Sequence, residues 1–142
     1  MKKVIIIFCS AILFIGLFTA CSSPNEPNNI TYKYQRIDIY TAKDFNKEIN
    51  TPILSINDEK TLNEISTIIS NSEKMPGILD VASPEYLLEI HDVNKSMQTV
   101  YLWIGKDSFK GMYMYKDNTE TGYSISKANT QKLRKIIVAT KE

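Results

Sequence analysis

Four side chains able to take part in acid–base chemistry lie close together in the sequence: Glu85, Glu89, His91 and Asp92. His91 is the one histidine of the chain, and a histidine held near carboxylates can act as a general base. Successive residues of a strand face opposite sides of a sheet, so Glu89 and His91 share a face that Asp92 does not. A surface histidine at a strand end explains the same pattern without catalysis. The cluster therefore supports a carboxylate-dependent hydrolase or transferase as the alternative interpretation.

Aromatic side chains form a second candidate site. Tyr101, Trp103, Tyr113 and Tyr115 fall on what we expect to be consecutive strands. If they share one sheet face, they form a cross-strand cluster. An exposed cluster of this kind can stack on the sugar rings of cell-wall glycan or dock a protein partner. A buried one would be part of the core, so both interpretations stay open.

The first residues of the chain predict its location. Two lysines precede an apolar run over residues 4–18, which is shorter than the roughly 20 residues of a spanning helix. The order Leu17-Phe18-Thr19-Ala20-Cys21 resembles the bacterial lipobox, in which a peptidase cuts before the cysteine and the thiol takes a diacylglycerol. We expect a lipoprotein signal peptide over 1–20, a lipidated Cys21 that begins a flexible tether over 21–31, and one extracytoplasmic domain over 32–142. An uncleaved anchor helix is the alternative, and it also places the domain outside the cytoplasmic membrane.

Composition excludes several other classes. The chain has 17 basic and 16 acidic residues, so it lacks the basic footprint of a nucleic-acid-binding protein, and we expect no nucleic-acid partner. Its two cysteines are Cys9, in the segment expected to be removed, and Cys21. A zinc site normally needs three or four histidine, cysteine or carboxylate ligands at short spacing. With one histidine and no available thiol, we expect no metal ion and no cofactor.

The elements that must position these residues follow from the apolar pattern. A strand is expected over 32–39, with a slip near Gln35-Arg36, and another over 53–56. Residues 57–70 form an amphipathic helix with Asn57 or Asp58 at its start, and the loop over 73–84 contains the apolar segment Met75–Asp80. That segment either tucks over the core or contacts a partner.

Four strands and a helix complete the chain. The strands are expected over 86–91, 99–104, 109–115 and 123–125, and the helix runs to residue 137 with Ser126 or Asn129 at its start. The fold class is therefore α+β: an antiparallel β-meander sheet with two amphipathic helices packed on one face. We expect function on the other face.

Several segments together resemble the small Gram-positive lipoproteins of the YhfM-like kind. They are Pro84-Glu85-Tyr86, residues 101–105, and residues 122–126 leading into 133–137. The resemblance covers most of the chain from about Tyr32 onward. It implies the extracytoplasmic address and the fold, and it carries no catalytic or binding residue with it.

The leading functional expectation is a membrane-anchored module that is not an enzyme. It would bind an envelope protein or cell-wall component through the face bearing Tyr101, Trp103, Tyr113 and Tyr115. The alternative is the carboxylate-dependent hydrolase or transferase described above. A third possibility is an accessory subunit or inhibitor that acts through the Met75–Asp80 loop.

Overall fold

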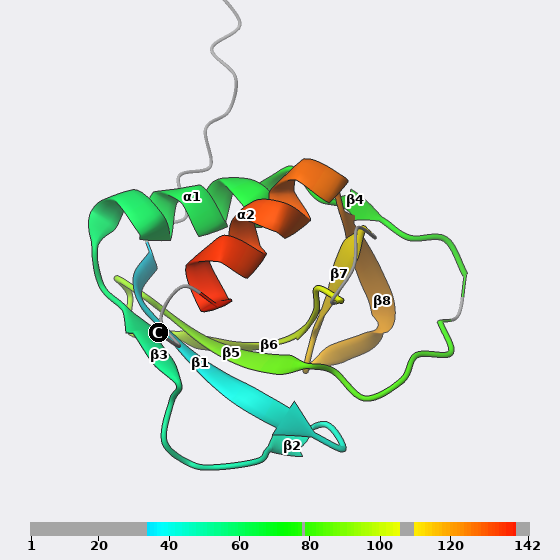
Figure 1. Cartoon of the computed structure of the whole chain (residues 1–142), viewed down its shortest axis with the longest axis horizontal. Helices are drawn as coiled ribbons and strands as arrows, with labels where there is room; N and C mark the ends of the chain where they lie inside the picture. The colour runs from blue at the N-terminus through cyan, green and yellow to red at the C-terminus, as the bar shows by residue number, and fades with distance from the viewer. Residues whose placement is uncertain (1–33, 78, 106–109, 139–142) are drawn as a thin grey trace, which may run out of the picture. The chain divides into compact units, whose positions relative to one another are not determined.

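The computed structural model describes residues 34–77, 79–105 and 110–138. The predicted signal peptide, Cys21 and the predicted tether lie outside these residues. The elements in chain order are β1 (Tyr34–Lys43), β2 (Asn46–Lys47), β3 (Leu54–Ile56), α1 (Glu59–Ser70), β4 (Glu73–Lys74), β5 (Tyr86–Asp92), β6 (Met97–Trp103), β7 (Gly111–Tyr115), β8 (Asn118–Ile125) and α2 (Lys127–Val138). Figure 1 shows their arrangement.

All strands join one antiparallel sheet in the order β2-β1-β5-β6-β7-β8-β4, and β3 pairs with β1. The predicted meander is the run from β5 to β8. The sheet curves strongly, so that β7 and β8 stand beside the two helices (Figure 1). The predicted slip near Gln35-Arg36 is confirmed, because the register of β1 against β5 shifts between Tyr34 and Arg36.

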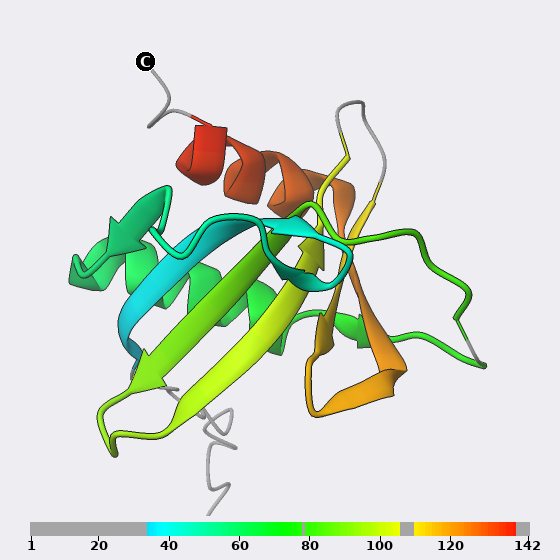
Figure 2. The ribbon, with the colours of Figure 1, turned by 90° about the horizontal axis from the view of Figure 1, so that it is seen from below.

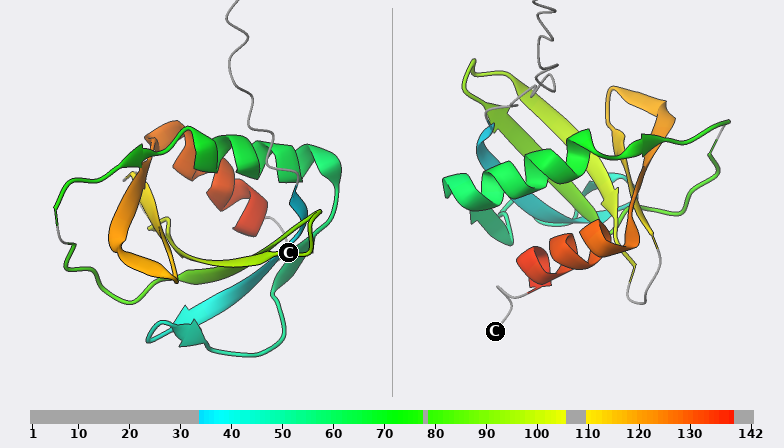
Figure 3. Two further views of the ribbon diagram at one scale, coloured as in Figure 1. Left: turned by 180° about the vertical axis from the view of Figure 1, so that it is seen from behind. Right: turned by 90° about the horizontal axis from the view of Figure 1, so that it is seen from above.

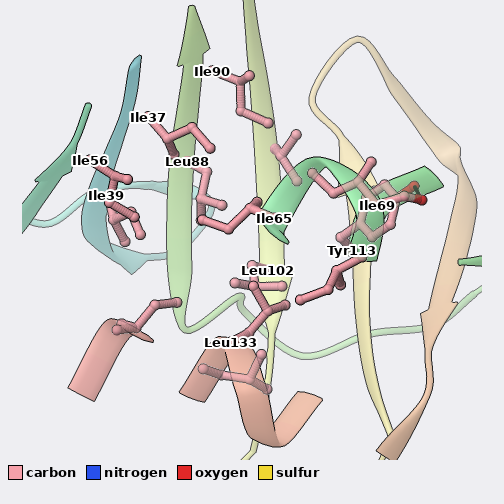
Figure 4. Packing of buried hydrophobic residues seen from close by; sticks show 14 of the residues in the cluster. Ile37, Ile39, Ile56, Ile65, Ile69, Leu88, Ile90, Leu102, Tyr113 and Leu133 are labelled. Carbon is pink, nitrogen blue, oxygen red and sulfur yellow. Dashed lines mark hydrogen bonds between the residues drawn. The ribbon is translucent and has the colours of Figure 1, made fainter. Parts of the chain in front are cut away.

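Both helices cover the same face of the sheet, as expected (Figure 3). Ile37 and Ile39 of β1 and the inward residues of β5 and β6 pack against Ile65 of α1 and Leu133 of α2 (Figure 4). These side chains are at most 3% exposed, and each fully buried aliphatic side chain stabilises the fold by about 1.5–3 kcal/mol. The predicted α+β class is therefore confirmed. Neither described helix is long and apolar enough to cross a membrane.

The helix starts follow the predicted capping residues. The Asp58 carboxylate accepts a hydrogen bond from the Thr61 backbone N–H at 2.9 Å. Hydrogen bonds from the Thr61 backbone and side chain hold the pKa of Asp58 below its ordinary value. Before α2, the Ser126 hydroxyl accepts from the Asn129 backbone N–H at 3.3 Å. Of the alternatives left open at each helix, Asp58 and Ser126 therefore occupy the N-cap position, directly before the first helical residue.

Two short stretches differ from the expectation. β4 lies inside the predicted loop over 73–84, because Glu73 and Lys74 pair with the distant residues Ser124 and Tyr123 of β8. Both β4 residues are exposed and polar, so no local apolar alternation marks this strand. β8 begins at Asn118, ahead of the strand expected over 123–125, because Asn118 already pairs with Tyr115.

The loop after β4 folds back onto the sheet. The Met75 backbone N–H donates to the Gly122 carbonyl at 2.8 Å. A Cβ atom at Gly122 would collide with Leu79 Cδ1 and would lie 3.4 Å from Met75 Sδ. Met75 and Leu79 therefore pack over β8, whereas Pro76, Gly77 and Asp80 are exposed. Ile78 lies outside the described residues.

Thr130 joins α2 to β7 through a buried hydroxyl. It is fully buried, accepts the Gly111 backbone N–H at 2.7 Å and donates to the Ser126 carbonyl at 2.9 Å. Thr130→Val keeps the shape and leaves that N–H without a partner, so we expect the free energy of unfolding to fall by about 1–3 kcal/mol. Urea denaturation of the wild type and the variant measures this loss of stability. Thr130→Ser keeps the hydroxyl and is the control; a serine variant less stable than the valine variant would contradict the prediction.

Candidate functional site

The sheet face opposite the helices carries a row of polar side chains on its two central strands. The inward positions of β1 and β5 are isoleucine and leucine, so the residues between them point outward. Those residues are Arg36, Asp38 and Tyr40 on β1, and Glu89 and His91 on β5. Arg36 pairs in register with His91, and Asp38 with Glu89. Figure 2 shows this face of β1, β5 and β6, with the helices behind it.

Asp38 lies at the centre of the row and is only 6% exposed. Its Oδ1 accepts the Ser55 hydroxyl at 2.6 Å, and its Oδ2 lies 2.9 Å from Arg36 Nε and 3.3 Å from His91 Nε2. Arg36 Nη2 also lies 3.3 Å from His91 Nε2. A buried carboxylate is costly unless it is paired and hydrogen-bonded, and Asp38 satisfies both conditions.

Glu89 forms the neighbouring part of the network. Its Oε1 lies 2.7 Å from Lys47 Nζ, and its Oε2 accepts the Tyr40 hydroxyl at 3.0 Å. Lys47 Nζ also lies 3.9 Å from the centre of the Tyr40 ring. Burial lowers the pKa of Lys47, but the Glu89 carboxylate outweighs it, so the pKa is raised. Burial and then Glu89 raise the pKa of Tyr40. These shifts keep Lys47 charged and Tyr40 neutral.

The contact between Asp38 and His91 is of a kind that supports acid–base chemistry by the histidine. A carboxylate beside an imidazole orients the ring and stabilises the protonated form that appears when histidine takes a proton. His91 is 26% exposed at its side chain. In the part of the chain that the structure describes, Nε2 carries the ring's contacts with Asp38 and Arg36. The other nitrogen, Nδ1, is then available to a bound molecule.

Asp38, Glu89 and His91 also resemble a metal-ligand set, because one ligand atom from each lies within 4.8 Å of the others. However, each carboxylate already has a cationic partner, Arg36 at 2.9 Å and Lys47 at 2.7 Å. A divalent ion would have to displace both cations. The charges present therefore suit acid–base chemistry better than metal binding.

Two cavities open on this network. One, of about 420 Å³, is lined by Gln35, Arg36, Asn57, His91, Asp92 and Lys95. The other, of about 280 Å³, is lined by residues that include Phe45, Lys47 and Glu89. The catalytic candidates thus border space that a small molecule can enter.

The predicted cluster of four is only half assembled. Glu89 and His91 share the outer face as expected, but Glu85 accepts the backbone N–H groups of Ile104 and Gly105 at 3.0–3.2 Å. Asp92 accepts the Asn94 and Ser96 N–H groups at 2.8 and 3.0 Å, as well as the Ser96 hydroxyl. The bonds from Ser96 hold the pKa of Asp92 below its ordinary value. Glu85 therefore holds the end of β6, and Asp92 stabilises the turn after β5.

The predicted aromatic cluster is divided between the two faces of the sheet. In the register of β6 and β7, Tyr113 lies opposite Leu102, not opposite Tyr101 or Trp103. Tyr101 and Trp103 pack with Phe45 on the outer face, at ring-centre distances of 5.4 and 6.3 Å from it.

Tyr113 and Tyr115 instead pack with Tyr123 on the helix side, at ring-centre distances of 4.9 and 5.8 Å from it. Tyr113 is 3% exposed and donates its hydroxyl to the Ile69 carbonyl at 3.2 Å. This burial raises the pKa of Tyr113. The expectation that the four rings share one face is wrong, because these two strands are paired one residue away from the register it requires.

Sequence reasoning missed Arg36, Asp38 and Ser55. A signal was present, because polar residues alternate with isoleucine from Arg36 to Tyr40. That alternation predicts an outward polar row. It does not predict that β1 pairs with β5, which lies far along the chain, so the meeting of Asp38 with His91 could not be anticipated.

Comparison with known proteins gives one family match and one structural match. The family profile described as YhfM protein matches residues 31–142. Among solved structures, a thioesterase-like protein from Clostridium sporogenes matches with a TM-score of 0.58 and 20% identity, covering 74% of this chain and 94% of that one. No curated protein sequence matches significantly. The structural match shows a shared fold.

The structural match corrects the leading functional expectation. A non-catalytic binding module is contradicted, because the fold is shared with a protein described as thioesterase-like. The division of the aromatic residues between the two faces also removes the surface on which the binding module depended.

Proposed function

We propose that this chain, which belongs to the YhfM protein family, is a small hydrolase or acyl transferase acting on esters or thioesters. The observation that carries the proposal is the contact between the buried Asp38 carboxylate and His91 Nε2, 3.3 Å apart, at the edge of a cavity of about 420 Å³. The fold shared with a thioesterase-like protein supports the reaction class. Of the predicted cluster, this proposal gives a role to His91, and it adds Asp38 and Arg36.

The proposed reaction needs three roles. His91 takes a proton from the attacking water, or from an acceptor hydroxyl in the transferase case, as the oxygen bonds to the acyl carbon. Asp38 stabilises the imidazolium, and the half-exposed Arg36 guanidinium stabilises the developing oxyanion. The carbon–oxygen or carbon–sulfur bond then breaks, and His91 returns the proton to the leaving atom. No other group is required.

The direct test is hydrolysis by the full chain. A panel of nitrophenyl esters and acyl thioesters of differing acyl length should include at least one substrate turned over above the uncatalysed rate. Asp38→Asn should lower kcat more than it raises KM, because the neutral amide cannot stabilise the imidazolium. Glu85→Gln is the matched control, since Glu85 binds backbone N–H groups at the end of β6. Activity that persists equally in both variants would contradict the assigned roles.

We further propose that the protein works as a lipoprotein on the outer side of the cytoplasmic membrane, attached through acyl chains on Cys21. The order of residues 17–21 supports this proposal. Acyl chains supply about 0.8 kcal/mol of membrane affinity for each buried methylene. The substrate would then be a component of the cell envelope.

A further inference from the structure

The cavity beside His91 has the chemistry of an anion site. Its lining comes from separate parts of the fold: Arg36 on β1, Asn57 before α1, His91 on β5 and Lys95 in the turn between β5 and β6. Three of these side chains carry or can acquire a positive charge, and Asn57 offers an amide N–H. A ligand entering this cavity meets mainly hydrogen-bond donors.

The two nearby carboxylates are already occupied. Asp38 is buried beneath Arg36 and His91, and its oxygens are engaged by them and by Ser55. Asp92 also lines the cavity, but both of its oxygens accept hydrogen bonds from the turn that it stabilises. The carboxylates therefore hold the cations and the turn in place and leave donors facing a ligand.

Lys95 is placed by the turn itself. Its backbone has a φ of +65°, in the left-handed region that non-glycine residues seldom adopt. Its N–H donates to the Asp92 carbonyl at 3.2 Å. Within the described parts of the chain, its ammonium group forms no salt bridge. The ammonium is therefore available to a ligand at the cavity, together with the outer edge of the Arg36 guanidinium.

From this arrangement we propose that the cavity binds a carboxylate or phosphate group through Arg36 and Lys95. The choice of substrate rests on the proposed function: the preferred ester or thioester carries an acidic group close to the scissile bond, where it is held while His91 acts. Such a group can come from a soluble metabolite or from an anionic lipid headgroup, and both present the same oxygen acceptors.

The test measures binding separately from catalysis. Full-length, ¹⁵N-labelled protein in neutral detergent is titrated with inorganic phosphate and with acetate. Saturable shifts of the amide signals of Asn57, His91 and Lys95 are expected. Lys95→Gln and Arg36→Gln should each weaken binding about tenfold, the factor lost with one charged hydrogen bond. Lys132→Gln, on the exposed face of α2, is the matched control and should leave binding unchanged.

Two further measurements are needed. One distinguishes a lipid headgroup from a soluble anion, and the other distinguishes failure of the anion site from failure of the proposed function. Binding to phosphatidylglycerol vesicles that exceeds binding to inorganic phosphate, and is lost in Lys95→Gln, identifies a lipid headgroup; the reverse order identifies a soluble anion. Phosphate binding without hydrolysis of any ester supports the anion site and overturns the proposed function. Hydrolysis with no shift at these three amides, or with shifts centred on Lys116, which lines the other cavity, overturns the anion site.

Discussion

Replacing His91 by Gln is expected to lower kcat of the full chain on its best ester substrate by about a hundred- to ten-thousand-fold, the range that general-base catalysis supplies. Glutamine can keep a hydrogen bond toward Asp38, but its amide cannot take a proton. KM should change less than kcat, because the lost interaction belongs to the transition state. Steady-state kinetics measures both quantities.

A second substitution at the same position shows whether the loss is chemical. His91→Ala opens space beside Asp38, and added imidazole should restore part of the rate if His91 acts as the base. Melting curves should remain close to those of the wild type, since the side chain is partly exposed. A His91→Gln enzyme with normal kcat would show that the base lies elsewhere and that the contact between His91 and Asp38 only stabilises the sheet.

The fold class was predictable because it depends on local patterns. Apolar residues spaced by three and four mark both helices, and alternation marks the strands of the meander. Even the irregularity near Gln35-Arg36 was predictable, since a bulge shifts the alternation of apolar and polar residues within its own strand. The strands β2 and β4 could not be predicted from the sequence, because each is two residues long and depends on a partner strand.

The candidate site was less predictable because it depends on register between distant strands. His91 and Glu89 were identified from their own strand. Asp38 became part of the site only through the pairing of β1 with β5, which no spacing within either strand specifies. The same dependence caused the error over the tyrosines: one residue of register decides whether Tyr113 and Tyr101 share a face.

The hairpin between β1 and β2 shows a local conflict that tertiary contacts resolve. Asp44 and Phe45 have φ values of +48° and +62°, in a two-residue turn where glycine and asparagine are preferred. The Phe45 ring packs on Tyr101 and Trp103, and the Phe45 carbonyl accepts the Tyr101 hydroxyl at 3.1 Å. These contacts hold the hairpin beside Glu89 and place Lys47 on its carboxylate.

The second large effect is expected at the other end of the chain. If the protein is the lipoprotein that we propose, Cys21→Ala should move it from almost wholly membrane-bound to almost wholly released or unprocessed, because the proposed acyl chains would supply its membrane affinity and alanine has no thiol to acylate. Incorporation of labelled palmitate, followed by fractionation of a Gram-positive host, measures both attachment and location. Cys9→Ala is the matched control. It removes the other thiol of the chain, within the segment expected to be cut away, and should change neither measurement.

The comparison of these two cysteine variants also bears on catalysis. The Cys21→Ala protein should keep its activity on a soluble ester, because the sheet face carrying Asp38 and His91 lies in the region that the family profile covers, from residue 31 onward. Its activity toward a substrate embedded in the membrane should fall, because tethering raises the local concentration of enzyme at the surface. Equal loss on both substrates would mean that the anchor supports folding instead of location, and palmitate incorporation into Cys21→Ala would place the anchor at another residue.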